Sequence, residues 1–239
     1  MVKSKYNRVL LKLSGESFCK PGGFGIDGQA LGSIAERIAE INKTGLQVAV
    51  VVGAGNFLRG ENFSQVSHIP RNTADYMGML ATIINACALQ ETIEKLGHET
   101  RVLSAIDVPA LCESFIRRRA IRHLERGRIT ILAGGTGNPF FTTDTCAALR
   151  ASELEVDLLI KATKVKGVYS DDPKKNPNAK MFEKLSYDEV LSKNLRIMDH
   201  SAITLCRDNH IPIIVLNIFK KGEISRALSG EKVGTTIVA

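Results

Sequence analysis

The sequence predicts an α/β fold in which a mainly parallel central sheet is flanked by helices on both faces, as an αβα sandwich. Segments typical of strands and of helices alternate along the 239 residues. The run at 46–52 is almost continuously apolar and rich in valine, as expected of a parallel strand buried on both faces. No internal repeat or flexible linker interrupts the alternation. We therefore expect a single domain over residues 1–239.

Each expected element follows from hydrophobic spacing and from the residues that end it. Apolar residues between Leu31 and Ile41 recur on one helix face, and Gly45 ends this helix. A helix from about Thr73 to Leu96 is apolar on more than one face, which favours a central position or a subunit contact. Further helices are expected at 112–126, 144–155, 187–193, 199–209 and 223–228, and strands at 8–13, 46–52, 100–106, 129–132, 156–161, 212–217 and 235–238.

The composition indicates a protein with a hydrophobic core and no membrane-spanning segment. Hydrophobic residues make up 44% of the chain, which is enough for a substantial core. No apolar run approaches the roughly 18 residues that cross a bilayer, and the charged stretch 1–8 leads into a strand and does not resemble a signal peptide. We expect a cytoplasmic protein without a membrane partner. The five cysteines form no C-x-x-C pair and are expected to be buried apolar residues.

The formal net charge of +7 is compatible with anionic partners, which include nucleotides as well as nucleic acids. The basic residues are spread out except for a cluster of arginines between 117 and 128. A solvated helix face explains this cluster better than a binding surface. Because the chain has no RNA-recognition signature and no aromatic residues interleaved with the basic ones, we do not expect a nucleic-acid partner.

The most unusual stretch is 132–144, Leu-Ala-Gly-Gly-Thr-Gly-Asn-Pro-Phe-Phe-Thr-Thr-Asp, which follows a buried strand and leads into a helix. Three other loops with glycines, hydroxyls or lysines also follow strands, at 12–15, 53–56 and 161–164. Ligands of parallel sheets bind beyond the carboxyl ends of the strands. Glycine amides, hydroxyls and lysines suit phosphate groups. We therefore expect these four loops to form one phosphate-binding edge.

Several enzyme classes are disfavoured. The chain contains no Walker A motif and no G-x-G-x-x-G followed by a ribose-binding acid at the expected distance. It also lacks a nucleophile elbow, and its histidines are scattered. Phosphate recognition without a nucleophile or a base indicates phosphoryl transfer, a reaction that depends on positioning and charge neutralisation. A phosphate acceptor needs no base, because its oxygen is already largely anionic near neutral pH.

Six motifs resemble those of the bacterial UMP kinases, which have the amino acid kinase fold. The matching motifs are Lys-Leu-Ser-Gly-Glu (12–16), Gly-Phe-Gly-Ile-Asp (23–27), Gly-Asn-Phe-Leu-Arg-Gly (55–60), Asp-Tyr-Met-Gly-Met-Leu-Ala-Thr (75–82), Gly-Thr-Gly-Asn-Pro-Phe-Phe-Thr-Thr-Asp (135–144) and Lys-Ala-Thr-Lys-Val-Lys-Gly-Val-Tyr (161–169). The resemblance implies Mg²⁺-dependent transfer of the ATP γ-phosphoryl group to UMP in pyrimidine nucleotide biosynthesis, giving UDP and ADP. It also implies a UMP-binding part at about 1–155 and an ATP-binding part at about 156–239.

The resemblance carries site roles onto matching residues, with Mg²⁺ held mainly by the phosphates and no protein metal ligand. The implied catalytic residues are Lys12, Arg59 and Asp144. The implied ATP-binding residues are Lys12, Leu13, Ser14, Gly15, Gly55, Arg59, Thr163, Tyr169 and Asp172. The implied UMP-binding residues are Ala54, Asp75, Thr136, Gly137, Asn138, Pro139, Phe140, Phe141, Thr142 and Thr143. Lys161 and Lys164 are supporting candidates for charge neutralisation.

Three positions remain open. The family usually has three consecutive glycines where this chain has Gly53-Ala54-Gly55. A main-chain contact at Ala54 survives the change from glycine to alanine unless φ of this residue is positive. Asp144 either organises the metal-bound phosphates or stabilises the start of a helix. Asp199 is either a site residue or a helix cap.

The resemblance also implies a homohexamer that GTP activates and UTP inhibits. The expected activator site is the loop of Lys20, Pro21, Gly22, Gly23, Phe24 and Gly25. Arg101 and Arg128 are further candidates for phosphate contacts there.

Two other functions compete with UMP phosphorylation. Another amino acid kinase, acting on glutamate, aspartate or carbamate, would share the ATP half and differ at Asp75 and the 136–143 loop. A nucleic-acid-binding regulator would bind DNA or RNA with a strong salt dependence and show no turnover.

Overall fold

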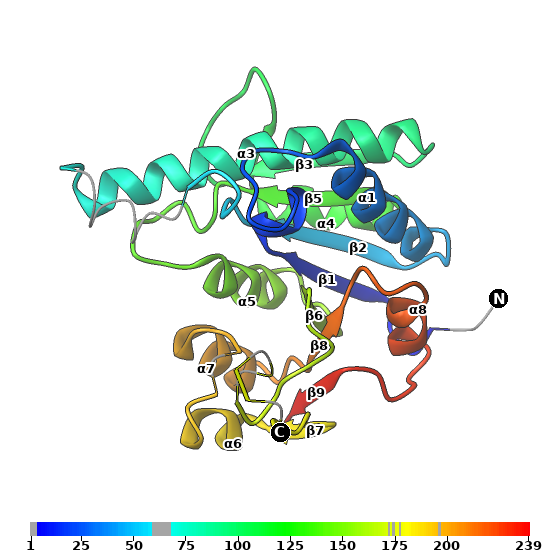
Figure 1. Cartoon of the computed structure of the whole chain (residues 1–239). Coiled ribbons are helices and arrows are strands. Elements are labelled where there is room, and N and C mark those ends of the chain that lie inside the picture. The colour runs from blue at the N-terminus through cyan, green and yellow to red at the C-terminus, as the bar shows by residue number, and fades with distance from the viewer. Residues whose placement is uncertain (1–3, 59–67, 172, 174, 177, 196) are drawn as a thin grey trace.

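The computed structural model describes residues 4–58, 68–171, 173, 175–176, 178–195 and 197–239. These residues form a nine-stranded sheet flanked by helices on both faces, in the order β4-β3-β5-β2-β1-β6-β8-β9-β7 (Figure 1). The strands are β1 (Arg8–Leu13), β2 (Gln47–Val52), β3 (Thr100–Ser104), β4 (Glu113–Ser114), β5 (Ile129–Ala133), β6 (Leu158–Thr163), β7 (Lys184–Ser186), β8 (Ile213–Asn217) and β9 (Thr235–Val238). The helices are η1 (Gly15–Phe18), α1 (Gly28–Asn42), α3 (Arg71–Lys95), α4 (Arg117–Glu125), α5 (Thr143–Glu153), α6 (Tyr187–Ser192), α7 (His200–Asp208) and α8 (Glu223–Leu228).

The sheet is parallel except at β8 and β9, which pair antiparallel, so the predicted α/β fold with a mainly parallel sheet is confirmed. Strands β1 to β5 form one half of the sheet and β6 to β9 the other. Figure 1 shows the N-terminal elements, in blue to green, in the upper half and the C-terminal elements, in yellow to red, in the lower half. The two halves meet where β1 pairs with β6, and this register places Lys12 beside Lys161.

The core has two layers, one on each face of the sheet. In β1, Val9, Leu11 and Leu13 belong to the cluster that packs under α1, α3 and α8, whereas Leu10 belongs to the cluster under α5 and α7. This alternation follows from the two-residue period of a strand. It also explains why the strands read as continuous apolar runs, since both faces are covered.

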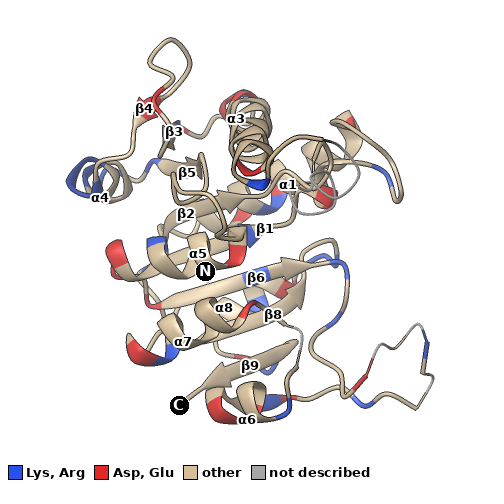
Figure 2. Cartoon of the chain, turned by 90° about the vertical axis from the view of Figure 1, so that its left-hand side faces the viewer, with Lys and Arg blue, Asp and Glu red and all other residues tan. Residues whose placement is uncertain are grey.

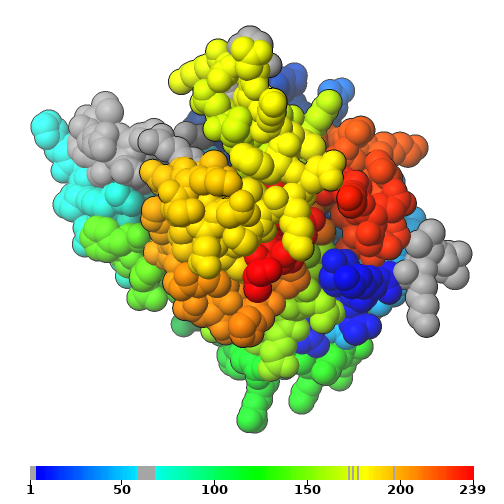
Figure 3. All heavy atoms as spheres, turned by 90° about the horizontal axis from the view of Figure 1, so that it is seen from below, coloured from blue at the N-terminus to red at the C-terminus, as the bar shows by residue number. Residues whose placement is uncertain are grey.

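The first described residues pack against the C-terminal half of the molecule. The main-chain N–H of Lys5 donates to Leu228 O of α8 at 3.2 Å, and the Ser4 hydroxyl also donates to this oxygen. Figure 3 shows the first described residues, in blue, beside the orange-red segment that contains α8. None of the described helices is both long and apolar enough to cross a membrane.

Two expectations about element bounds were inaccurate. The helix expected at 112–126 begins only at Arg117, because Glu113 and Ser114 pair with β3 as the short strand β4. The strand β7, which pairs with β9, was not expected, since three residues carry too little pattern to show the period of a strand.

The arginines of α4 lie on an outer helix, which Figure 2 shows as a blue patch at one edge of the molecule. Arg117 pairs with Glu155 and Arg119 pairs with Glu113. This arrangement agrees with the interpretation of the cluster as a solvated face.

Candidate active site

A cavity of about 550 Å³ opens at the carboxyl ends of β1, β2 and β5 and is the first cavity of the site. It brings together twelve of the residues singled out from the sequence: Lys12, Ser14, Gly15, Gly53, Ala54, Gly55, Asp75, Thr136, Phe141, Thr142, Thr143 and Asp144. Three of the four strand-end loops, 12–15, 53–56 and 132–144, therefore meet here, whereas the 161–164 loop does not line this cavity. Ser14, Gly15 and Gly55, which the resemblance places with ATP, line the same cavity as Asp75 and Thr136.

A charge cluster of Lys12, Asp144 and Lys161 lies at the end of the first cavity. Lys12 and Lys161 are register partners on neighbouring parallel strands, so their side chains leave the same face of the sheet. The Nζ of Lys12 lies 2.8 Å from Asp144 Oδ1, and the Nζ of Lys161 donates to Asp144 Oδ2 at 2.8 Å. All three side chains are largely buried, with exposed fractions of 11%, 16% and 15%. Two ammonium groups and one carboxylate leave a net positive charge, which favours an anionic ligand.

The pKa values of the cluster follow from burial and from mutual attraction. Burial raises the pKa of the Asp144 carboxyl, but the charges of Lys12 and Lys161 outweigh this effect, so the pKa lies below its ordinary value. Burial lowers the pKa of the Lys161 ammonium below its ordinary value, and the attraction of Asp144 offsets only part of that change. The carboxylate therefore stays ionised near neutral pH, and its charge opposes the effect of burial on Lys161.

Asp144 is not the cap of α5. The Thr142 hydroxyl oxygen accepts hydrogen bonds from the main-chain N–H groups of Asp144 at 3.1 Å and Thr145 at 3.2 Å, which makes Thr142 the N-cap. The Asp144 carboxylate instead faces the two lysines. Its position in the first helical turn gives some stabilisation from the helix dipole, but its ion pairs decide its orientation.

Asp199 is a helix cap that also joins the two halves of the molecule. Its carboxylate accepts from the main-chain N–H of Ala202 at 2.8 Å and so caps α7. It also accepts from the hydroxyls of Thr142 and Thr145, the latter at 2.9 Å. The end of the 132–144 loop is therefore attached to the C-terminal half.

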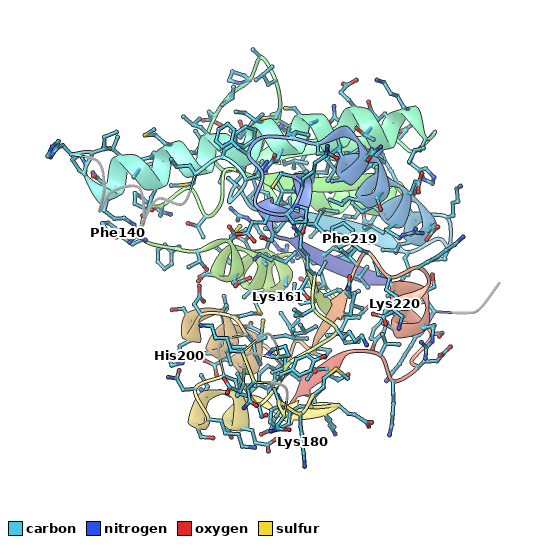
Figure 4. All side chains as sticks on the ribbon, in the orientation of Figure 1. Phe140, Lys161, Lys180, His200, Phe219 and Lys220 are labelled. Atoms are coloured by element: carbon cyan, nitrogen blue, oxygen red, sulfur yellow. The ribbon has the colours of Figure 1, made fainter. Side chains whose placement is uncertain are left out.

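Asp75 connects α3 to the 132–144 loop. Arg71, four residues earlier on α3, donates to both carboxylate oxygens of Asp75 at 2.8 and 2.9 Å. The main-chain N–H of Phe140 also donates to Asp75, at 2.8 Å. Arg71 lies 5.9 Å from the centre of the Phe140 ring, and Figure 4 shows Phe140 near the amino end of α3. The sequence interpretation missed Arg71, although its (i, i+4) spacing from Asp75 is typical of an ion pair on a helix.

The backbone of the 132–144 loop is left-handed at Gly134. Gly134 has a φ of +73°, and a Cβ there would lie 2.7 Å from the Ser104 Oγ, so only glycine fits. The N–H of Gly134 donates to the buried Thr82 hydroxyl at 2.8 Å. Four expected acceptor residues are not among those that line the first cavity: Gly137, Asn138, Pro139 and Phe140. Phe140 is 68% exposed, because its main-chain N–H, rather than its ring, is the group held by Asp75.

A second cavity of about 700 Å³ lies between β6, β8, the segment that follows β6 and the residues after α6. Its lining includes the predicted Thr163 and Tyr169 together with apolar Val168, Leu195 and Val215. A third, more open cavity contains both Asp144 and Lys161, while Asp144 also lines the first cavity and Lys161 the second. The charge cluster therefore stands at the junction of two separate binding spaces.

Some predicted residues are not placed at the site. Arg59 and Asp172 lie outside the described residues. Lys164 donates to the main-chain oxygen of Glu16 at 2.9 Å. The Leu13 side chain is fully buried in the core, so only its main chain could face a ligand.

Arg101 and Arg128 lie away from the 20–25 loop of the same chain, so their contribution to the activator site stays a prediction for the assembly. The loop lies before the first residue of α1, whereas Asn42 at the end of α1 donates to Gly127 O, next to Arg128. A helix of 15 residues spans roughly 20 Å. Arg101 pairs with Glu94 and Arg128 with Glu99 instead.

A substitution at Gly15 tests the close contact between the 12–15 and 53–56 loops. A Cβ at Gly15 would lie 2.2 Å from Gly55 N, so Gly15→Ala must push the two loops apart. We expect kcat/KM to fall about 30-fold, which corresponds to about 2 kcal/mol of transition-state stabilisation. The matched control is Gly32→Ala in α1, where a Cβ meets no atom within 4 Å. Steady-state kinetics of both variants would refute the contact if they behaved alike.

The comparisons with known proteins agree with this geometry. Residues 7–217 match the model of the amino acid kinase family. The chain is 40% identical to the UMP kinase from Bacillus anthracis, with a TM-score of 0.94 over 98% of this chain and 96% of that one. It is 37% identical to the UMP kinase from Ureaplasma parvum, with a TM-score of 0.91 over 98% of this chain and all of that one. The chain therefore belongs to the amino acid kinase family and is an ATP-dependent kinase.

Proposed function

We propose that this kinase transfers the γ-phosphoryl group of ATP to UMP, giving UDP and ADP, in pyrimidine nucleotide biosynthesis. The observation that carries the proposal is the Lys12–Asp144–Lys161 cluster at the junction of two cavities. The two solved relatives described as UMP kinases, which match nearly the whole chain, favour UMP as the acceptor.

The first cavity is the proposed UMP site. Asp75 accepts from the ribose hydroxyls, and Thr136, Phe141, Thr142 and Thr143, which line this cavity, border the uracil and the α-phosphate. The main-chain groups of Ala54 and Gly55 border this phosphate. Ala54 is not among the residues with positive φ, so the alanine is compatible with a main-chain contact there.

The second cavity is the proposed ATP site. Its apolar walls and the ring of Tyr169 suit an adenine, and the hydroxyl of Thr163 lies at the edge that leads to Lys161. We accordingly assign the residues from about 156 onward to the ATP-binding part and the earlier residues to the UMP-binding part. Asp172, outside the described residues, remains a candidate for the ribose.

Transfer needs charge neutralisation more than acid–base chemistry. An oxygen of the UMP phosphate attacks the γ-phosphorus, the bond to the β-phosphate oxygen breaks, and ADP leaves with that electron pair. Lys12 and Lys161 face the transferred group and stabilise its negative charge. Asp144 orients both ammonium groups, while Arg59 remains a proposed phosphate contact. This set of residues fits Mg²⁺ held mainly by the phosphates, because the Asp144 carboxylate is already paired; when bound, the ion would neutralise further phosphate charge.

We also propose a homo-oligomer. Four apolar side chains on one face of α3 are exposed, namely Tyr76, Met77, Leu80 and Ile84. A subunit contact would bury this stripe, and the hexamer itself rests on the resemblance. Regulation by GTP at residues 20–25, inhibition by UTP and a cytoplasmic location are proposed on the same basis.

The proposed function is tested by the release of ADP with different acceptors. We expect turnover with UMP in Mg-ATP, tested with and without GTP, and much weaker turnover with CMP, dUMP, glutamate and carbamate. Turnover with glutamate or carbamate alone would support another amino acid kinase activity. Salt-sensitive binding of DNA or RNA without any turnover would support the nucleic-acid-binding function instead.

Asp75→Asn tests the placement of the acceptor. The amide keeps the size of the side chain but loses the negative charge, so we expect the KM for UMP to rise about tenfold with little change in the KM for ATP. The matched control is Asp188→Asn, which removes a surface carboxylate paired with Arg207. An effect on the ATP KM alone would show that the two cavities are assigned the wrong way round.

A further inference from the structure

Two asparagines, Asn56 and Asn85, form a closed hydrogen-bond network directly behind the 53–55 turn. The two side-chain amides donate to each other, from Asn56 Nδ2 to Asn85 Oδ1 at 3.0 Å and from Asn85 Nδ2 to Asn56 Oδ1 at 2.8 Å. Asn56 Nδ2 also donates to Gly25 O at 2.8 Å, and Asn85 Nδ2 to Gly53 O at 2.7 Å. The side chains are buried, with exposed fractions of 2% and 0%.

The network has a single amide orientation. If either amide were flipped, its oxygen would face the main-chain oxygen of Gly25 or Gly53, and the two lone pairs would repel. Apolar side chains of similar size would fill the same space but would leave Gly25 O and Gly53 O without these donors. What the amides add is a fixed position for two main-chain carbonyl groups.

The Gly53 carbonyl belongs to the same peptide unit as the N–H of Ala54. This unit is planar and trans, so its C=O and N–H point in opposite directions. By holding Gly53 O, Asn85 fixes the direction of the Ala54 N–H, which points away from Asn85. Ala54 lines the first cavity, and the N–H of Gly53 is also fixed, because it donates to Leu13 O at 2.9 Å.

The other end of the network holds the segment at Gly25. The N–H of Gly25 donates to the main-chain oxygen of Asn56 at 2.9 Å, and the rings of Phe24 and Phe57 pack edge to face at 5.6 Å. The pair of amides therefore holds the 53–55 turn through Asn85 and the end of the 20–25 loop through Asn56.

We propose that Asn85, paired with Asn56, is a positioning residue that aims the main chain at 54–55 toward the acceptor phosphate. The inference rests on the proposed function, in which the first cavity binds UMP. The pair touches no substrate and acts through the peptide between Gly53 and Ala54. Its loss should weaken recognition of the phosphate and leave recognition of the nucleoside and of ATP unchanged.

Asn85→Asp tests this role. Aspartate has the shape of asparagine and still accepts from Asn56, but it cannot donate to Gly53 O when it is ionised. We expect the KM and the dissociation constant of UMP to rise about tenfold, while the dissociation constants of uridine and ATP change less than about twofold. The matched control is Ile93→Val, which shortens a fully buried side chain on the same helix. It should lower Tm without affecting the ratio of UMP to uridine affinity.

Further variants at Asn56 and a hydrogen-exchange measurement test the same role if Asn85→Asp does not fold. Asn56→Ala breaks the same network from the other side and replaces Asn85→Asp if that protein does not fold. The double variant Asn56→Ala/Asn85→Ala should lose no more UMP affinity than the more affected single variant, because the pair acts as one unit. Hydrogen exchange at 53–57 and 24–26 should be faster in the asparagine variants and unchanged in Ile93→Val.

The outcomes separate this inference from the proposed function. If the parent enzyme neither binds nor phosphorylates UMP, the proposed function fails. If the parent uses UMP but the variants lose UMP, uridine and ATP affinity equally, or lose none, the positioning role is overturned. Unchanged hydrogen exchange at 53–57 would overturn the network itself, whichever acceptor the enzyme uses.

Discussion

Lys12→Met is expected to lower kcat about 10³-fold while the protein remains folded. The methionine keeps most of the length of the side chain, but the ammonium group beside the transferred phosphoryl group is lost, and removal of one such donor commonly costs 10² to 10³ in rate. The Lys12 side chain is 11% exposed and lies at the junction of the two cavities, where little water can replace its charge. Single-turnover kinetics with UMP and Mg-ATP would measure the effect on the chemical step.

The control for this variant is Lys95→Met, which removes an exposed lysine at the end of α3. It should have near-parental turnover, which separates loss of net charge from loss of a specific cation. Turnover of Lys12→Met within about tenfold of the parent, with an unchanged circular dichroism spectrum, would remove Lys12 from the proposed mechanism.

Asp144→Asn is expected to lower kcat/KM by about 10² and to change its pH dependence. The amide cannot balance two ammonium groups, so Lys12 and Lys161 repel each other and lose their orientation. Burial and Lys12 both lower the pKa of Lys161, and Asp144 is the main group that raises it. Without that carboxylate, the pKa of Lys161 should fall further, and the alkaline limb of the kcat/KM profile should move to lower pH.

The Asp144 carboxylate should also make the stability of the folded protein depend on pH. Its pKa is lower in the folded protein than in the unfolded chain, so its contribution to stability is present above the unfolded pKa and is lost as pH falls through the folded value. The Tm of the parent should therefore drop more steeply than that of Asp144→Asn below about pH 4. A parent and variant with parallel Tm profiles and equal alkaline limbs would show that Asp144 does not control the lysines. The matched control is Asp157→Asn, a surface carboxylate directly before β6 that accepts from the main-chain N–H groups of Asn7 and Arg8.

Much of the fold could be predicted from local pattern. The bounds of α8 and β9 agree with the expected segments, since each has a clear start, spacing and end. The expectation of one binding edge also held for the first cavity, because the carboxyl ends of parallel strands must meet. The short strands β4 and β7 could not be predicted, as their pairing depends on neighbours that are distant along the chain.

The sequence by itself determined the α/β alternation, the glycine and lysine loops at the strand ends, and the resemblance that points to a phosphate acceptor. It left open whether Asp144 stabilises the start of a helix or organises the metal-bound phosphates, and only the tertiary structure shows that Asp144 is not the cap and faces two lysines. This arrangement depends on the pairing of β1 with β6, which brings Lys12 beside Lys161 although 149 residues separate them. Thr142 then caps α5, and the Asp144 carboxylate turns toward the two cations. A buried carboxylate needs an opposite charge beside it, so Asp144 pairs with the lysines and not with the helix N-terminus. Burial is a property of the folded chain and cannot be read from the local sequence.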